Sequence, residues 1–542
     1  MKSFFYSTLC VAGSAMLLVS ACDKNDTDSA PQANDLSKPL TAFSCAAPAE
    51  GTNYTIYPLG AGNAGVGDVM PYYEAASNTS YIYYLRDIWD DGTSQHHPVN
   101  AFTTSSFTAY TATSGGEVLS SGSGTCAQDF AVGTGSVVER NGTYYLFYTG
   151  NNPNASNCTN QKEGVMLATA TGPGQKFTKN PSFPTIYAPA NQGYDFNDNF
   201  RDPFVYFDAA SNQYLMLVSA RKDVGGGNWK GVLAKYTSAN LLSWTYQGVL
   251  YDGGSDNFFN MECADLFKLG NTYYLLFSDQ GSQQVLYRKS TSLNGPWTTP
   301  SGPARFDGTG FYAAKVLTDK FGDNYLMGWV NRQDGNSDTG NRRWGGNLVV
   351  HKLYQTSSGD LAVTIPHTLK SYLEGKTVSL VKNSQVGNVT TGTNNTYTIA
   401  SAPNSFLHNV MFDPVQATHF KLSTTVNYAS AGKDFGFMLG ACDNYNGFYS
   451  LRFIPAQNRF SLDKVDRRNV TISSQTLDVP FQLKSNTDYT VEIVEENSVV
   501  TVYLNNKAAL TCRVYRAPRT SWGIFADDAT ATFKNLTVTT SN

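Results

Sequence analysis

The sequence contains few charged residues and very few histidines. Only 15% of its 542 residues are Asp, Glu, Lys or Arg, and the formal net charge is −4. Proteins that bind DNA or RNA neutralise phosphates with clustered basic residues, so this composition argues against a nucleic-acid partner. The six histidines are scattered, and the eight cysteines include no C-x-x-C pair. We therefore expect neither a metal site nor a cofactor.

Long apolar runs are also scarce, and the clearest one lies at the N-terminus. Residues 1–21 carry Lys2, an apolar stretch and small residues at the end, which predicts a signal peptide. This stretch is too short and wrongly flanked for a membrane-spanning helix. Its end, Val19-Ser20-Ala21-Cys22, resembles a bacterial lipobox, which implies that Cys22 is lipidated; a plain signal peptide is the alternative. Residues 22–40 then form a flexible, lipidated tether, because they are polar and lack apolar periodicity.

These features predict an exported protein that is lipid-anchored through Cys22 to a membrane of the bacterial cell envelope, with the outer membrane as the expected one. An exported protein can form disulfides. Cys10 lies in the signal peptide and Cys22 carries the lipid, which leaves six cysteines. Cys126–Cys158 and Cys442–Cys512 are plausible pairs among them, although connectivity does not follow from sequence.

The abundant feature is aromatic residues, at 13% of the chain, and they recur in a repeated pattern. Five segments each carry an apolar strand, a polar turn and an aromatic-rich strand, beginning at residues 68, 136, 202, 262 and 311. Each segment predicts a β-hairpin, and a further strand follows it. Repeats of this size built from short strands predict a β-propeller with about four strands in each blade. We expect an all-β chain with a five-bladed propeller over residues 41–370.

The remaining residues, 371–542, have a different pattern. Strands such as Phe420–Val426 and Asp434–Leu439 alternate apolar and polar residues and are joined by short turns. This pattern is typical of an antiparallel β-sandwich. A structural role is expected for this module, with sugar binding as a weaker alternative.

Three carboxylates begin the first strand of a repeat: Asp68, Asp202 and Glu262. The first strand of each blade lines the central channel of a propeller, so these side chains should meet at one mouth of it. Taken alone, Arg201-Asp202-Pro203 would be a turn with a surface ion pair. Pro203 favours an extended conformation for Asp202, and the Arg201 guanidinium can bind hydroxyls or a carboxylate.

Paired carboxyl groups are what glycoside hydrolysis requires, one as proton donor and one as nucleophile or base. Glu262 lies in an apolar strand, a setting that suits a proton donor. Asp68 follows Gly65-Val66-Gly67, where the glycines leave room for a ligand, and Asp202 with Arg201 can hold sugar hydroxyls.

Four stretches in order resemble motifs of glycoside hydrolase family 32, the invertase, levanase and inulinase family. Phe200-Arg201-Asp202-Pro203 is similar to its R-D-P motif, and Met261-Glu262-Cys263-Ala264-Asp265-Leu266 to its E-C-P-D-L motif. The other two are Phe306–Ala314, which resembles D-x-G-x-D-F-Y-A, and the segment from Trp344, which resembles W-x-G.

The resemblance implies retaining hydrolysis of β-fructofuranosides such as levan, inulin or sucrose. Asp68 would be the nucleophile, Glu262 the acid/base, and Asp202 the residue that stabilises the transition state. The residues expected to bind substrate are Arg201, Thr134, Cys263, Asp265 and Trp344.

The chain departs from the family at the first motif, usually W-M-N-D-P-N-G. Here Gly67 stands where the family has Asn before the nucleophile, and Val69 replaces the following Pro. Two alternatives therefore stay open. One is an inverting arabinosidase or xylosidase resembling glycoside hydrolase family 43. The other is a non-catalytic, surface glycan-binding lipoprotein.

Overall fold

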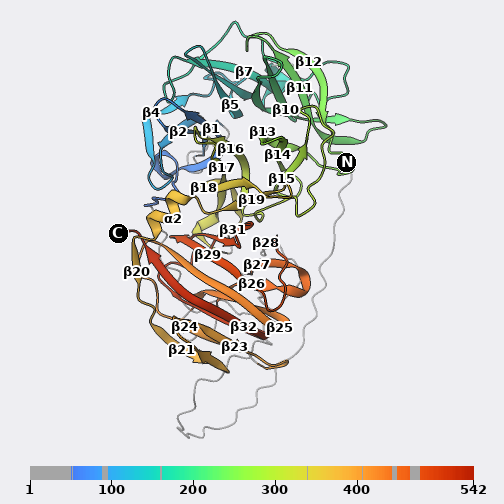
Figure 1. Cartoon of the computed structure of the whole chain (residues 1–542). Coiled ribbons are helices and arrows are strands. Elements are labelled where there is room, and N and C mark those ends of the chain that lie inside the picture. Colours follow the sequence, from blue (N-terminus) through green and yellow to red (C-terminus); the bar gives the residue numbers. More distant parts are fainter. Residues whose placement is uncertain are drawn as a thin grey trace, which may run out of the picture.

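The computed structural model describes residues 51–542, apart from 52, 88–95, 159–160, 339, 406, 442–447 and 464–476. The predicted signal peptide, the tether and Cys22 lie outside the described residues. The described chain is almost entirely β-strand and forms a five-bladed propeller followed by a β-sandwich, which confirms the predicted fold class (Figure 1). No helix in this part of the chain is long and apolar enough to cross a membrane.

Five blades make up the propeller. Blade 1 contains β1 (Gly65–Glu74), β2 (Thr79–Asp87), β3 (Val99–Thr104) and β4 (Thr111–Leu119). Blade 2 contains β5 (Ala131–Arg140), β6 (Thr143–Asn151), β7 (Glu163–Ala170) and β8 (Thr178–Lys179), and blade 3 contains β9 (Phe200–Asp208), β10 (Gln213–Asp223), β11 (Trp229–Ser238) and β12 (Thr245–Tyr251). Blade 4 contains β13 (Met261–Leu269), β14 (Thr272–Asp279) and β15 (Gln284–Ser290), and blade 5 contains β16 (Phe311–Thr318), β17 (Asn324–Gln333), β18 (Arg342–Gln355) and β19 (Leu361–Thr364). Short helices η1 (Ala61–Asn63), α1 (Ala155–Cys158) and η2 (Asp334–Asn336) lie in the connections.

The first strand of each blade is innermost, and these strands contact one another around the ring in the order β1, β5, β9, β13, β16. Each of them carries a one-residue β-bulge at the same place, near its N-terminal end. A bulge bends a strand locally and redirects the side chains on it. The propeller therefore has five equivalent positions at one end of its channel, and the candidate site residues occupy them.

The bulge corrects one expectation. Asp202 is not extended, because its φ is +59°, and Cys263 and Ala313 at the equivalent positions have φ of +52° and +51°. The preference of a residue before proline is local, whereas the pairing of β9 with β10 sets the bulge and overrides it.

The two ends of the propeller meet between blades 1 and 5. All strands of blade 1 come from residues 65–119, and all strands of blade 5 come from residues 311–364. The blades are joined where Val66 of β1 pairs with Gly346 of β18, and where Leu348 N donates to Pro58 O at 3.0 Å. The ring therefore closes by contact between two complete blades.

The sandwich is organised on two long strands, β25 (His419–Ala441) and β32 (Ser521–Thr540), which pair along most of their length. The other strands are β20 (Lys376–Val378), β21 (Lys382–Val386), β22 (Val389–Thr391), β23 (Tyr397–Ala400), β24 (His408–Phe412), β26 (Tyr449–Ile454), β27 (Arg459–Asp463), β28 (Leu477–Pro480), β29 (Tyr489–Glu496), β30 (Val499–Leu504) and β31 (Ala508–Arg513), with η3 (Pro455–Gln457) between β26 and β27. The two strands expected at 420–426 and 434–439 form one strand, because bulges opposite β32 absorb the residues between them.

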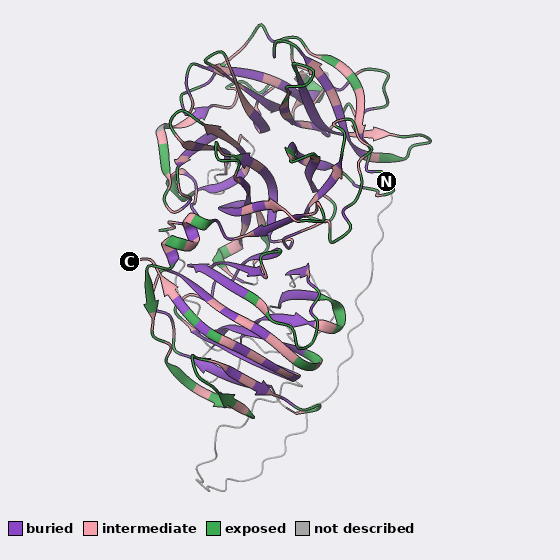
Figure 2. Ribbon diagram, viewed as in Figure 1, coloured by how far each residue is buried: buried purple, intermediate pink, exposed green. Residues whose placement is uncertain are grey.

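The two modules share one apolar core. Helix α2 (His367–Leu373) follows the last propeller strand, and residues of β29, β30 and β31 pack with those of blades 4 and 5. Asp307 lies at this junction: Oδ1 accepts from Thr511 N at 2.7 Å, and Oδ2 accepts from Thr511 Oγ1 at 2.6 Å and contacts His351 Nε2 at 2.9 Å. Most strands of both modules are buried, and the exposed residues concentrate in the loops (Figure 2).

A second contact at the junction holds the start of the described chain. Glu496 of the sandwich is fully buried, and its carboxylate accepts from the backbone N–H groups of Thr55, Ile56 and Tyr57 at 2.6, 2.9 and 2.8 Å. The segment before blade 1 is therefore bound to the sandwich.

One of the two plausible disulfides is present. Cys126 and Cys158 are bonded, with their Cα atoms 5.0 Å apart, and they tie the segment before β5 to helix α1. Cys442 lies outside the described residues, so its pairing with Cys512 stays a prediction.

Candidate active site

A pocket of about 350 Å³ lies at the end of the channel where the bulges are. Its lining includes all three predicted carboxylates, Asp68, Asp202 and Glu262, although these residues come from three different blades. The other lining residues are Leu85, His97, Ala131, Val132, Gly133, Thr134, Thr149, Asn151, Pro153, Lys162, Glu163, Arg201 and Trp344.

Asp68 is held in the β1 bulge by two neutral donors. Thr134 Oγ1 from blade 2 donates to Asp68 Oδ2 at 2.5 Å, and Trp329 Nε1 from blade 5 donates to Oδ1 at 3.0 Å. Burial raises the pKa of Asp68 above its ordinary value, and the charge of Glu262 adds to this, whereas the two donors lower it. Two uncharged donors therefore fix the orientation of the Asp68 carboxylate.

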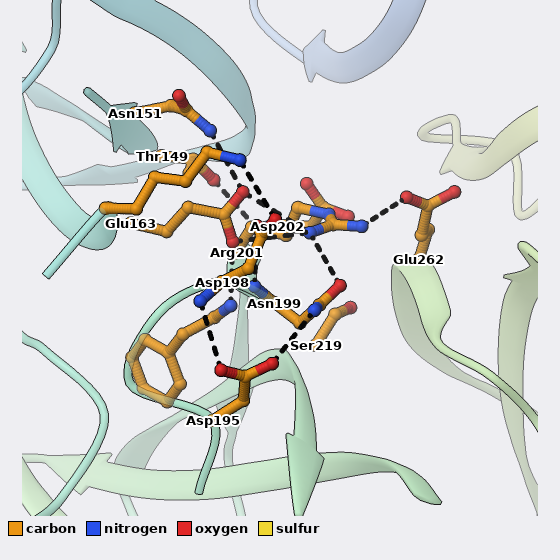
Figure 3. A network of polar contacts seen from close by, with 12 residues as sticks. Thr149, Asn151, Glu163, Asp195, Asp198, Asn199, Arg201, Asp202, Ser219 and Glu262 are labelled. Atoms are coloured by element: carbon orange, nitrogen blue, oxygen red, sulfur yellow. Dashed lines mark hydrogen bonds and ion pairs between the residues drawn. The ribbon is translucent and has the colours of Figure 1, made fainter. Parts of the chain in front are cut away.

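Arg201 of blade 3 connects a carboxylate of blade 2 with one of blade 4 (Figure 3). Its Nη2 atom donates to Glu262 Oε1 at 2.7 Å, and its Nη1 atom donates to both oxygens of Glu163 at 3.3 Å. Asn199 Oδ1 and Gln280 Oε1 accept from the same guanidinium at 3.2 and 3.3 Å. These carboxylates raise the pKa of Arg201 well above its ordinary value, although burial opposes them, so the side chain is a permanent cation in the site.

Glu262 lies in β13 directly before the bulge, and partners hold both of its oxygens. Arg201 binds Oε1, and the hydroxyl of Tyr312 from blade 5 donates to Oε2 at 2.7 Å. Burial and the neighbouring Glu262 raise the pKa of Tyr312, so its hydroxyl stays protonated and acts as the donor. The carboxyl group is thereby oriented from both sides.

Asp202 is the most deeply buried of the three, with 3% of its surface exposed. Its backbone N–H donates to Thr149 Oγ1 at 2.8 Å, and its Oδ2 accepts from Cys263 N at 2.9 Å. The pKa of Asp202 is raised to about 7, because burial and the charges of Glu262 and Asp68 together outweigh the lowering effect of Arg201 and of the Cys263 N–H. This carboxyl group therefore titrates near neutral pH.

The other predicted binding residues have different positions. Trp344 lines the pocket, and Thr134 lines it while supporting Asp68. Cys263 and Asp265 lie beneath the pocket, with 1% and 2% exposed. Asp265 Oδ2 accepts from Val316 N of blade 5 at 2.6 Å, so this geometry favours a role in joining blades 4 and 5 over direct contact with a ligand.

Sequence reasoning missed three residues of the site: Glu163, Tyr312 and Trp329. Glu163 begins the apolar strand β7, as the predicted carboxylates begin theirs, and that signal could have identified it. Tyr312 lies in the Phe306–Ala314 stretch that resembles a family motif, and that resemblance could have identified it. Trp329 lies inside the repeat of blade 5, where aromatic residues are so common that nothing distinguishes it in sequence.

The pocket contains two oriented carboxyl groups in different surroundings, those of Asp68 and Glu262. The third carboxyl group, that of Asp202, is more deeply buried. Asp68 is bound by a threonine hydroxyl and an indole, and Glu262 by a guanidinium and a phenol. Two carboxyl groups in different environments are suited to acid–base and nucleophilic roles in the cleavage of a glycosidic bond.

Two family models match the chain. Residues 125–363 match the Glycosyl hydrolases family 32 N-terminal domain, and residues 359–538 match the GH32, BT1760-like, C-terminal domain. The first match begins after blade 1, so Asp68 and its altered motif lie outside the matched range.

Curated relatives cover part of the chain. Sucrose-6-phosphate hydrolase from Escherichia coli is 29% identical over 256 residues, which are 44% of this chain and 50% of the relative. Levanase from Bacillus sp. (strain L7) is 35% identical over 124 residues, 23% of this chain and 12% of the relative. The chain thus spans about half the length of the first of these relatives and less of the second.

Solved structures show the same fold over nearly the whole chain. Sucrose-6-phosphate hydrolase from Lactobacillus gasseri has a TM-score of 0.64 at 17% identity, covering 90% of this chain and 94% of that one. Fructan 1-exohydrolase IIa from Cichorium intybus has a TM-score of 0.69 at 14% identity, covering 91% and 98%.

Proposed function

The chain belongs to glycoside hydrolase family 32, and on this premise we propose that it is an exported β-fructofuranosidase. It releases fructose units from levan, inulin or sucrose-type substrates by a retaining double displacement. The observation that carries the proposal is the meeting of Asp68, Asp202 and Glu262 in one pocket from three blades.

Each carboxyl group has one role in the proposed reaction. Asp68 attacks the anomeric carbon of the fructosyl unit and forms a covalent intermediate, while Glu262 gives a proton to the departing oxygen. Glu262 then takes a proton from the water that releases fructose. The contacts of Thr134 and Trp329 with Asp68 support this assignment, because they hold its carboxylate in one orientation for attack.

Asp202 stabilises the sugar as positive charge develops on it, and Arg201 supports the proton donor. Asp202 is deeply buried in the lining of the pocket, and its Oδ2 accepts a hydrogen bond from Cys263 N. Its carboxyl group is placed to accept hydrogen bonds from fructosyl hydroxyls, which strengthen in the transition state. Arg201 orients Glu262 beside it.

Charge in the pocket favours an uncharged sugar, although several relatives are named as sucrose-6-phosphate hydrolases. The basic side chains Lys162 and Arg201 that line the pocket are already ion-paired, Lys162 with Asp198 at 2.9 Å and Arg201 with Glu262 at 2.7 Å. A phosphate would have to compete with these carboxylates, so we propose neutral fructosides as substrates.

The test compares Asp68→Asn and Glu262→Gln on a natural fructan and on an activated fructoside. Glu262→Gln should lose activity on the fructan but still release the leaving group of the activated substrate in an initial burst, because a good leaving group departs without a proton. Breakdown of the covalent intermediate should then be slow, because the base that activates water is missing. Asp68→Asn should lose both activities, since no covalent intermediate can form. Asp208→Asn, at the opposite end of β9 from Asp202, is the matched control and should behave as wild type.

Two outcomes would overturn the proposal. Wild-type turnover of both substrates by Asp68→Asn would remove Asp68 from the mechanism. Release of pentoses from arabinosides or xylosides, with no fructose from any fructan, would contradict the fructosidase assignment and favour a different propeller glycosidase.

A further inference from the structure

The absence of a side chain at Gly67 leaves space that the indole of Trp344 occupies. It lies directly before Asp68 in the β1 bulge, and a Cβ atom added to it would lie 2.6 Å from Trp344 Cζ3 and 2.7 Å from Cζ2, and closer still to Cη2. Contacts of Cβ atoms under 3.0 Å essentially never occur, so the indole could not stay in place beside any other residue at position 67. The glycine and the tryptophan therefore depend on each other.

The indole of Trp344 is a wall of the pocket. It comes from the N-terminal end of β18 and lines the same pocket as Asp68 and Glu262. Its ring centroid lies 4.5 Å from that of His97 and 6.0 Å from that of Trp329, and Trp329 donates to Asp68. Trp344 thus reaches the immediate surroundings of the proposed nucleophile from two directions, through Gly67 and through Trp329.

We propose, building on the proposed function, that Gly67 and Trp344 act as a coupled pair that determines substrate specificity. The indole occupies the volume that a polar side chain at position 67 would fill. It presents an apolar face to the C–H groups of the fructosyl ring that Asp68 attacks. Sugar rings bind well to indole faces of this kind, because their C–H groups are apolar and slightly positive.

The consequence concerns how the sugar is recognised. The related motif carries an Asn at the position of Gly67, and an amide in that place could bind a sugar hydroxyl. In this chain that polar contact is replaced by stacking against an aromatic surface. The pocket should therefore recognise the ring by its shape and depend less on one hydroxyl.

A double-mutant cycle tests the coupling through KM for a fructan oligosaccharide. Trp344→Ala removes the wall and should raise KM about tenfold, the effect of roughly 1.4 kcal/mol. Gly67→Ala should raise KM by about the same factor, because the methyl group displaces the indole. The double variant Gly67→Ala/Trp344→Ala should also stay near tenfold, since the wall is lost only once.

A second measurement observes the indole without activity. In protein labelled with 5-fluorotryptophan, the 19F signal of Trp344 is identified by its loss in Trp344→Ala. That signal should shift on addition of fructose to the wild type, and it should shift in Gly67→Ala without fructose. Gly124→Ala is the matched control, because a Cβ at Gly124 would meet no atom within 4 Å, and it should leave both the signal and KM unchanged.

The results separate this inference from the proposed function. A KM increase near a hundredfold in the double variant would mean that the two effects are independent, and it would overturn the coupling. A Trp344 19F signal that shifts neither on addition of fructose nor in Gly67→Ala would also overturn it. A wild-type protein that releases fructose from no substrate would instead overturn the proposed function, and the signal in Gly67→Ala would still test the contact.

Discussion

Replacing Asp202 by Asn should make the protein more stable at neutral pH while it removes activity. Burial raises the pKa of the Asp202 carboxyl group to about 7, and only 3% of the residue is exposed. The folded protein therefore holds a proton on this group that the unfolded chain has already released between pH 4 and pH 7. Stability must then fall as the pH rises through this range, because the native state binds the extra proton.

The magnitude follows from the difference between the two pKa values. The pKa of Asp202 rises from an ordinary value of 3.8 to about 7. At about 1.4 kcal/mol for each pKa unit, ionisation of this group in the folded state costs about 4 kcal/mol. Asn carries no charge and keeps an oxygen that can accept from Cys263 N. Asp202→Asn should therefore gain about 2 kcal/mol at pH 5 and up to about 4 kcal/mol at pH 8.

Urea unfolding at pH 5 and pH 8 measures these gains, and fructose release from a fructan measures the loss of activity. We expect activity to fall by a factor of about 10² or more, as when a transition-state contact is removed. A stability gain that is absent at pH 8, or equal at both pH values, would refute the reasoning. Such a result would mean that Asp202 is ionised at little cost in the folded protein.

Three further predictions concern the rest of the chain. Asp307→Asn should lower the free energy of unfolding by about 3 kcal/mol in urea, because it disrupts a buried carboxylate that Thr511 and His351 bind, and an effect under 1 kcal/mol would contradict this. Reduction of the Cys126–Cys158 disulfide, which spans 32 residues, should cost about 3–4 kcal/mol, seen as a lower melting temperature, and an unchanged one would count against a stabilising role. Cys22→Ser should move the protein from the membrane fraction to the soluble fraction of the cells, and identical fractionation of the two proteins would disprove the lipid anchor.

The fold could be predicted because it depends on signals that repeat. Alternating strands and turn residues recur in each blade, so an error in one segment leaves the architecture recognisable. The meeting of Asp68, Asp202 and Glu262 in one pocket could be predicted for the same reason, since each stands at the start of an apolar strand in its repeat.

The parts that sequence could not give depend on contacts between distant segments. The left-handed conformation of Asp202 follows from the pairing of β9 with β10, against the local preference before proline. The contact of Gly67 with Trp344 joins blades 1 and 5. Asp307 belongs to the Phe306–Ala314 stretch that resembles a family motif, yet its carboxylate binds Thr511 of the sandwich, and only the packed modules reveal this.

The way in which the propeller closes has a consequence for cooperativity. Blades 1 and 5 each contain strands from one end of the propeller sequence only, so strand pairing within a blade does not hold those ends together. Glu496 of the sandwich binds the segment before blade 1, and the same module packs against blade 5 through the core it shares with blades 4 and 5. The sandwich therefore reinforces the closure of the ring. A chain cut after blade 5 would keep the direct pairing of β1 with β18 but would lose the contacts through Glu496 and the shared core that support it. The contact of Trp329 from blade 5 with Asp68 from blade 1 crosses the seam between these blades, so we expect the orientation of Asp68 to be the first feature of the pocket to change.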